Sequence, residues 1–236
     1  MHTGTDMAIH MKGIIMDSKF IRLVQSLDPL FPIGSYTLSN GMETYVQKNV
    51  VCSREQLKEH LESYLYMLTF NDLAFAAKAY AECDVRELDM ICSALKAPFE
   101  IRSGSVKQCI RFLKLHTELD DYPALEQYKE QIDSGECSGH YCIAMGLFIK
   151  ETGVDLSEAL ELYCYSILSS MANHAVKLVP LRQLDGQKAL YDVEKKYPDA
   201  VRRSMAMEMD ELGASGCGFD IRSMQHENLF SRLYIS

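Results

Sequence analysis

The residues best suited to metal chemistry are two cysteines and a histidine in the middle of the chain. Cys137, His140 and Cys142 fall in one short stretch, and thiolate and imidazole are soft metal ligands. A closed structural zinc site uses four ligands, whereas this stretch offers three at a cramped spacing and has no second pair. We therefore expect no metal site here, and interpret His140 as a helix-start residue and the cysteines as packing residues.

Motifs for catalysis are absent from the sequence. It contains no Gly-x-Ser-x-Gly, no His-Glu-x-x-His and no Gly-x-x-x-x-Gly-Lys-Ser/Thr, which carry nucleophilic, zinc-dependent and nucleotide chemistry respectively. His174 is a candidate base or ligand on a long predicted helix, but a core histidine with a satisfied hydrogen bond is the more frequent case. We expect no catalytic residue and no cofactor. An enzyme with dispersed catalytic residues stays an alternative.

Composition indicates an ordinary globular protein with free thiols. Of the 236 residues, 47% are apolar and 24% charged, with a net charge of −9 and no basic block, so nucleic acid is not an expected partner. The eight cysteines form no Cys-x-x-Cys pair, and the first residues lack a secretory signal. The sequence therefore predicts a cytoplasmic protein without a membrane span.

Helix-start signals and a 3.6-residue period recur along the chain. Ser53, Asp84 and Asp155 each precede an apolar-periodic segment with Gln or Glu three positions later, the pattern of a helix N-cap. The longest such segment, 155–180, is expected to be the central core helix. Other predicted helices cover 53–68, 71–82, 84–96, 102–115, part of 120–138, 139–151, 181–196 and 198–211.

No strand pattern of convincing length appears in the sequence. The fold class is therefore predicted to be all-α. We expect one domain over residues 1–236, a bundle of about ten helices, because no stretch has the composition of a flexible linker. Residues 1–17 lack periodicity and are expected to fray.

A stiff turn interrupts this helical pattern at residues 27–45. Pro29 and Pro32 restrict their own backbone and that of the preceding residue, so a helix arriving from residue 20 should end near residue 28. Asn40, with Glu43 three residues later, is a plausible N-cap for the next helix. The segment is either a turn between core helices or a surface offered to a partner.

The C-terminal segment is the second unusual element. A glycine-rich stretch at 213–218 should hold a helix poorly and is expected to act as a hinge. It precedes a segment rich in apolar side chains, which proteins rarely leave together in water. Two alternatives remain open: residues 213–236 fold back on their own bundle, or they order when a partner docks.

Several motifs in consistent order resemble the UreF family of urease accessory proteins. The resemblance begins with Phe31-Pro-Ile-Gly-Ser-Tyr-Thr-Leu-Ser39 and Gly41-Met-Glu-Thr-Tyr45. It continues with Arg102-Ser-Gly, Gly139-His140, Gly146-Leu147, Tyr163-x-Tyr165-Ser166 and Lys177-Leu-Val-Pro-Leu-x-Gln183, and ends with Met224-x-His226-Glu227-x-Leu229-x-Ser231-Arg232-Leu233. The chain departs from the family pattern at Leu38, where a histidine is usual, and at Asn40, where an aromatic residue is common.

The resemblance implies an all-α, dimeric, non-enzymatic scaffold. Such a protein binds UreD (also called UreH) and recruits the GTPase UreG, so that nickel is delivered to apo-urease. For contact with UreD, the resemblance points to Arg222, His226, Glu227, Arg232, Leu233 and Tyr234 in the tail. For a surface beside or beneath that contact, it points to Pro32, Gly34, Ser35, Tyr36 and Glu43. Lys177 and Gln183 are expected near the dimer interface or the UreG-binding region. A general helical adaptor with other partners is the main alternative.

Overall fold

The structure, a computed structural model, describes residues 18–81, 83–214 and 216–234. The predicted fraying of residues 1–17 lies outside this range. The described residues form helices and connecting turns, with no strand among them, so the all-α prediction is confirmed. The α-helices are α1 (Ser18–Leu27), α2 (Met42–Gln47), α3 (Arg54–Phe70), α4 (Asp72–Tyr80), α5 (Val85–Leu95), α6 (Phe99–Leu119), α7 (Pro123–Asp133), α8 (Tyr141–Thr152), α9 (Leu156–Leu178), α10 (Gln183–Glu194), α11 (Tyr197–Met205) and α12 (Cys217–His226).

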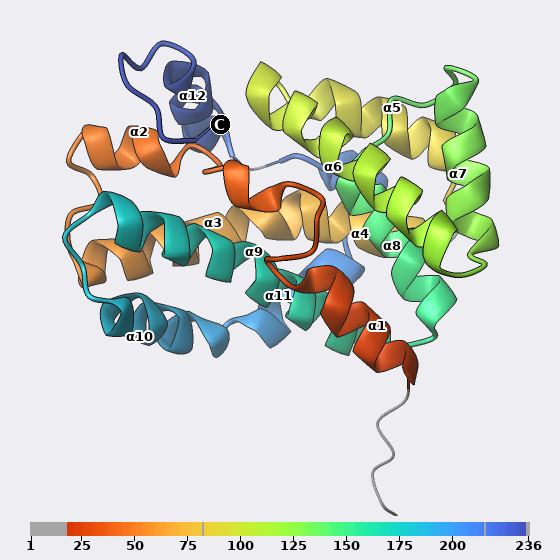
Figure 1. Cartoon of the computed structure of the whole chain (residues 1–236), viewed down its shortest axis with the longest axis horizontal. Coiled ribbons are helices and arrows are strands. Elements are labelled where there is room, and N and C mark those ends of the chain that lie inside the picture. Colours follow the sequence, from red (N-terminus) through yellow and green to blue (C-terminus); the bar gives the residue numbers. More distant parts are fainter. Residues whose placement is uncertain (1–17, 82, 215, 235–236) are drawn as a thin grey trace, which may run out of the picture.

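The helices pack as one bundle around a shared core. In Figure 1, α5 to α8 gather on one side and α2, α3, α9 and α10 on the other. The short helix α4 packs against members of both groups, most extensively against α8. Helix α12 lies beside α2 at one end of the molecule. Helix α12 also contacts α6, so the bundle brings the end of the described chain against α2 and α6.

The predicted helix starts are confirmed where a side chain caps the helix. Ser53 accepts the backbone N–H of Gln56 at 3.2 Å, and Asp84 and Asp155 each accept two N–H groups of their first turns. These bonds satisfy donors that a helix leaves unpaired at its N-terminus. The Gln56 amide oxygen accepts the N–H of Cys52 at 2.9 Å, one residue before the cap.

The predicted start of α2 is wrong by one residue. Gly41, not Asn40, is the N-cap, and it makes no side-chain capping bond. Asn40 has a φ of 51° and Gly41 a φ of 78°, so both lie in the left-handed region, whereas a capping side chain works from an extended backbone. The turn geometry thus overrides the capping signal in the sequence.

The C-terminal segment also differs from its prediction. Helix α12 begins inside the glycine-rich stretch and includes Gly218. Gly213 does not behave as a free hinge, because its N–H donates to the Phe70 carbonyl at 2.8 Å. Burial of the α12 side chains against the bundle offsets the low helix propensity of glycine, since tertiary packing supplies most helix stability in proteins.

Among the described residues, helix α9 contacts seven other helices, as expected of the central helix, whereas α8 is the helix buried on all sides. Every residue from Cys142 to Ile149 is buried, whereas α9 leaves Tyr165 half exposed. Helix α8 can lie so deep because Gly146 allows α4 to approach. A Cβ atom at position 146 would lie 2.1 Å from the carbonyl oxygen of Ala76.

We expect Gly146→Ala to lower the free energy of unfolding by about 3 kcal/mol, because the added methyl group meets backbone that cannot rotate away. Gly218→Ala is the matched control. Its Cβ would meet nothing within 4 Å, so alanine should be neutral or stabilise α12 by up to about 1 kcal/mol. Urea unfolding followed by circular dichroism measures both. Equal stability of the two variants would contradict the packing argument.

Candidate functional site

The turn between α1 and α2 is held in place by an arginine from α6. Gly34 has a φ of 86°, a conformation that side chains disfavour. The Arg111 Nη1 atom donates to the Ile33 carbonyl at 3.2 Å and would lie 2.1 Å from a Cβ at position 34. Glycine is therefore required at position 34 for two reasons: its backbone conformation, and the space that the Arg111 guanidinium fills.

Glu43, in the first turn of α2, binds the end of the chain. Its side chain is 4% exposed. One carboxylate oxygen accepts the Leu233 N–H at 2.7 Å, and the other accepts the Tyr234 N–H at 3.2 Å. Bonds between a carboxylate and backbone N–H groups are charge-assisted and among the stronger hydrogen bonds in proteins. Glu43 thus fixes the C-terminal segment to the turn.

A second carboxylate, Glu100 of α6, completes this connection through His226. The His226 ring is fully buried, with Nδ1 2.7 Å from Glu100 and Nε2 3.2 Å from Glu43. Arg232 Nη1 donates to the other oxygen of Glu100 at 2.7 Å. The imidazole ring therefore bridges the two carboxylates, with one ring nitrogen facing each. These three residues are called the Glu43–His226–Glu100 cluster below.

Helix α12 also packs its apolar face on the bundle. Phe219 inserts among Tyr45, His60 and Tyr64, with ring centroids 5.8, 5.5 and 5.2 Å away. Aromatic pairs at such distances stabilise beyond their buried area. A Cβ at Gly41 would lie 2.9 Å from a side-chain oxygen of α12, so this second glycine of the turn lets the helix approach. Of the two alternatives for the tail, the structure has it folded on its own bundle.

The predicted tail residues divide into buried anchors and exposed side chains. His226 and Tyr234 are buried, whereas Glu227, Arg232 and Leu233 are exposed. The half-buried Arg222 donates to Gln225 at 2.8 Å. The side chain of Leu233 is 65% exposed although its N–H is bound to Glu43. The tail therefore exposes some of its side chains to solvent while Glu43 binds its backbone.

The predicted turn residues divide in the same way. Gly34 and Glu43 are buried, Pro32 is exposed, and the side chain of Tyr36 is 64% exposed. Ser35 lines a cavity beneath the turn. The turn and the tail, predicted separately, are thus in direct contact through Glu43.

His174 joins α9 to both segments. Its Nε2 atom lies 3.1 Å from the Tyr36 carbonyl oxygen, and its ring centroid lies 4.3 Å from that of Tyr234. The interpretation of His174 as a core histidine with a hydrogen bond is confirmed. Lys177 is exposed in the last turn of α9, and Gln183 is exposed at the start of α10. Lys177 therefore flanks the turn and tail.

The cysteine and histidine stretch at 137–142 does not converge. His140 is the N-cap of α8, as expected, and its ring nitrogens face Ser93 at 2.7 Å and Ser105 at 3.2 Å. The Cys142 sulfur instead lies 3.8 Å from that of Cys92. Within the described ranges, no group of three or more His, Cys, Asp or Glu residues could hold a metal ion.

A cavity of about 100 Å³ lies beneath the turn, between α3, α6 and α9. Leu38 forms part of its wall and covers Gly104, where a Cβ would lie 3.0 Å from the leucine methyl group. Leu38, which stands where a histidine is usual in the family, thus makes an apolar contact with α6. It also explains Gly104 within α6, because a larger residue would meet Leu38.

Sequence reasoning missed Glu100 and Arg111, which hold the tail and the turn. Neither residue carries a local signal, because Glu100 resembles any acidic residue in a first helical turn and Arg111 any residue of an exposed helix face. Their partners are distant in sequence, at His226 and Ile33. Only the packing of α6 against both segments reveals them.

Three histidines are held neutral by burial. Desolvation lowers the pKa of His60, His116 and His174 from 6.5 to about 4. The unfolded chain binds these protons below pH 6.5, whereas the folded chain binds them only near pH 4. Acidification through that interval therefore favours unfolding, because the unfolded state holds more protons.

Lowering the pH from 7 to 5 is expected to reduce the free energy of unfolding by about 2 kcal/mol for each of these histidines. His60→Phe removes one such contribution and keeps the contacts with Tyr45 and Phe219. Urea unfolding at both pH values measures the difference. If the variant and the unchanged protein lose equal stability, His60 does not titrate as argued.

None of the described helices is both long enough and apolar enough to cross a bilayer.

Comparison with known proteins identifies the family. The family model described as UreF matches residues 51–194. The urease accessory protein UreF of Actinobacillus pleuropneumoniae serotype 5b (strain L20) is 36% identical over 221 residues, covering 91% of this chain and 97% of the relative. UreF of Haemophilus influenzae (strain ATCC 51907 / DSM 11121 / KW20 / Rd) is 34% identical, with 91% and 94% covered. UreF of Arthrobacter sp. (strain FB24) is 29% identical, with 92% and 96% covered. This chain therefore belongs to the UreF family of urease accessory proteins.

Proposed function

We propose that this protein is a cytoplasmic, non-enzymatic scaffold for urease maturation. It binds UreD (UreH) and recruits the GTPase UreG, so that nickel is inserted into apo-urease. Nickel is the cargo of this assembly rather than a resident cofactor of the chain. Membership of the UreF family supports the proposal.

The observation that carries the proposal is the convergence of the turn and the tail. Glu43 of the turn binds the backbone of Leu233 and Tyr234 at the end of the tail. Both segments then leave apolar side chains in solvent, namely Tyr36, Phe230 and Leu233. Exposed apolar side chains on a backbone that is held in place are typical of interaction sites. We assign this face to UreD.

A second face is proposed for UreG or for a second copy of the chain. Lys177 and Gln183 are exposed where α9 turns into α10. Helix α10 leaves Leu184 and Tyr191 more than half exposed, and Tyr165 of α9 lines the same groove. Aromatic and aliphatic side chains of this kind are enriched in interfaces. Light scattering from the purified chain, alone and with UreG, measures whether a dimer or a complex forms.

The alternative of a helical enzyme would need titratable groups able to exchange protons near neutral pH. In the cavity beneath the turn, burial raises the pKa of Tyr64, Tyr141 and Tyr163. Burial opposes the charge of Lys96, but the neighbouring Asp72 raises its pKa above the ordinary value. These shifts move the four groups away from neutrality, so they favour the scaffold over general acid–base catalysis.

Complementation tests the proposal. A urease operon that lacks its own UreF is expressed with this chain, and urease activity and nickel per active site are measured. Restored activity with nickel loading supports the scaffold role. If neither occurs, a pull-down with the cognate UreD follows, because accessory proteins can be matched by species. Failure of both experiments would leave the general helical adaptor with other partners.

A further inference from the structure

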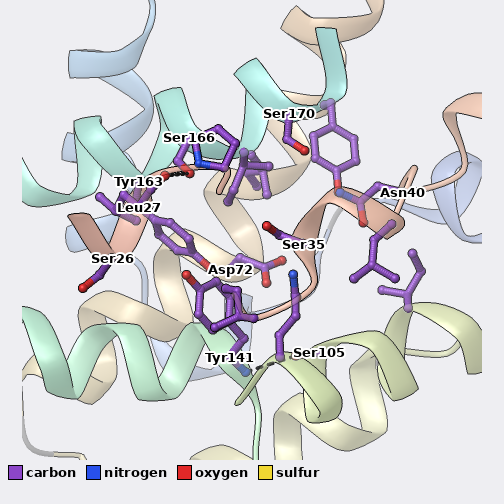
Figure 2. Close-up of a pocket in the computed structure, with 18 of the residues that line it drawn as sticks. Ser26, Leu27, Ser35, Asn40, Asp72, Ser105, Tyr141, Tyr163, Ser166 and Ser170 are labelled. Atoms are coloured by element: carbon purple, nitrogen blue, oxygen red, sulfur yellow. Dashed lines mark hydrogen bonds between the residues drawn. The ribbon is translucent and has the colours of Figure 1, made fainter. Parts of the chain in front are cut away.

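The outer face of α6 carries a stripe of positive charge. Four exposed residues follow the i, i+3, i+4, i+7 spacing of one helix face, namely Lys107, Ile110, Arg111 and Lys114. The opposite side of α6 is buried. It packs on α7 and α8, and Figure 2 shows its Ser105 among the residues that line the cavity beneath the turn. These four residues, called the α6 stripe below, are therefore presented to solvent.

The charge of the α6 stripe is not balanced within the protein. Residues 101–117 contain basic residues but no aspartate or glutamate. In the described part of the chain, no ion pair joins Lys107, Arg111 or Lys114 to an acidic residue. Glu118 lies one turn beyond Lys114 and forms no ion pair with it. The α6 stripe is therefore a local excess of positive charge on a protein whose net charge is −9.

Arg111 is held in place before any partner binds. Its Nη1 atom donates to the Ile33 carbonyl at 3.2 Å, and this bond uses one of the five N–H donors of the guanidinium. A side chain that is already held loses less conformational entropy when it binds a carboxylate. Ile110, next to it, is 50% exposed, so the α6 stripe also offers an apolar contact.

We propose that the α6 stripe docks an acidic helix of a partner protein. The stripe extends over about 10 Å, or two helical turns, and glutamates at the same spacing on a partner helix would face its three cations. An aliphatic residue among those glutamates would pack on Ile110. Single exposed ion pairs contribute little, so several at matched spacing are needed to hold the partner. Complementary charges of this kind speed association and select the partner.

The overall charge of the chain favours a helix over an extended polyanion. Nucleic acid and anionic lipid surfaces present negative charge well beyond two helical turns, and a protein with a net charge of −9 repels it outside the stripe. A single acidic helix covers only the stripe itself. The partner that matches this face is therefore a short acidic segment of a protein.

A designed peptide tests the proposal on the purified full-length chain. The peptide is an alanine-rich helix with three glutamates and one leucine at the spacing of the α6 stripe. Its comparator is a helix of the same composition with these residues spread over all faces. Fluorescence anisotropy of the labelled peptides measures binding. We expect the designed peptide to bind at least about tenfold more tightly than the comparator, with an affinity that falls as sodium chloride is added.

Charge reversal locates the site. Lys107→Glu combined with Lys114→Glu should weaken binding of the designed peptide by at least about tenfold, because like charges then face each other. The variant keeps Arg111, which holds the turn. Lys188→Glu combined with Arg202→Glu is the matched control. It has the same net charge, but its changes lie on α10 and α11, which pack on α3 and α9, so binding should stay unchanged.

The possible outcomes separate a specific docking face from general attraction of charge. If the two peptides bind alike, or if both double variants weaken binding equally, the proposal fails. Tighter binding of duplex DNA or of phosphatidylserine vesicles than of the designed peptide would also overturn it. Lys107→Gln combined with Lys114→Gln replaces the reversal variant if that variant does not fold. Because no urease protein is present, the result is independent of the proposed scaffold role.

Discussion

Replacing His226 with alanine is expected to lower the free energy of unfolding by about 3 to 5 kcal/mol, because it leaves the carboxylates of Glu43 and Glu100 without the imidazole that bridges them. Glu43 and Glu100 would then face one another across the space that the imidazole fills. Urea unfolding measures the loss, and hydrogen exchange at Leu233 and Tyr234 reports release of the tail. Both N–H groups are bound to Glu43 and should exchange faster.

Glu227→Ala is the matched control for this variant. Glu227 follows His226 directly, but its side chain is exposed, so its removal should change stability by no more than about 0.5 kcal/mol. A loss below about 1 kcal/mol for His226→Ala would mean that the Glu43–His226–Glu100 cluster does not hold the tail. Restored stability in His226→Ala combined with Glu43→Gln and Glu100→Gln would instead attribute the loss to unpaired charge.

Deleting residues 229–236 is expected to abolish UreD binding, with affinity reduced by at least about 100-fold, while the bundle stays folded. The deletion removes Phe230 and Leu233, which lie exposed on the proposed contact face. A few such side chains carry most of the energy of an interface. Calorimetric titration with the cognate UreD measures binding, and circular dichroism confirms the fold. Binding retained after the deletion would refute the assignment of this face.

A longer deletion from residue 214 would be a poorer experiment. It removes Phe219 from its cluster with Tyr45, His60 and Tyr64, so lost binding could reflect a damaged bundle. Leu233→Ser is the sharper companion variant, because the bond to Glu43 is made by the backbone N–H and survives. We expect this variant to weaken UreD binding while it leaves the melting temperature unchanged.

Local chemistry explains which structural predictions were confirmed. Ser53, Asp84 and Asp155 accept N–H groups only two or three residues away, so each cap is encoded in a few consecutive residues. The same holds for the end of α1 before Pro29 and for the end of α8 at Gly153, whose φ is 66°. Predictions failed at the start of α2, where the left-handed backbone of Asn40 and Gly41 prevents side-chain capping, and in the glycine-rich stretch that becomes α12, where packing on the bundle prevailed.

The sequence by itself determined the helical class, most helix boundaries and the two segments that distinguish this chain, because period, caps and proline act over a few residues. Only the tertiary structure decided that the turn binds the tail. Glu43 meets His226 and the tail backbone across a long span of chain, and Glu100 joins them from a third element. No local pattern encodes such a meeting, because it depends on how α2, α6 and α12 pack. The cavity follows the same logic, since its three tyrosines come from three different helices.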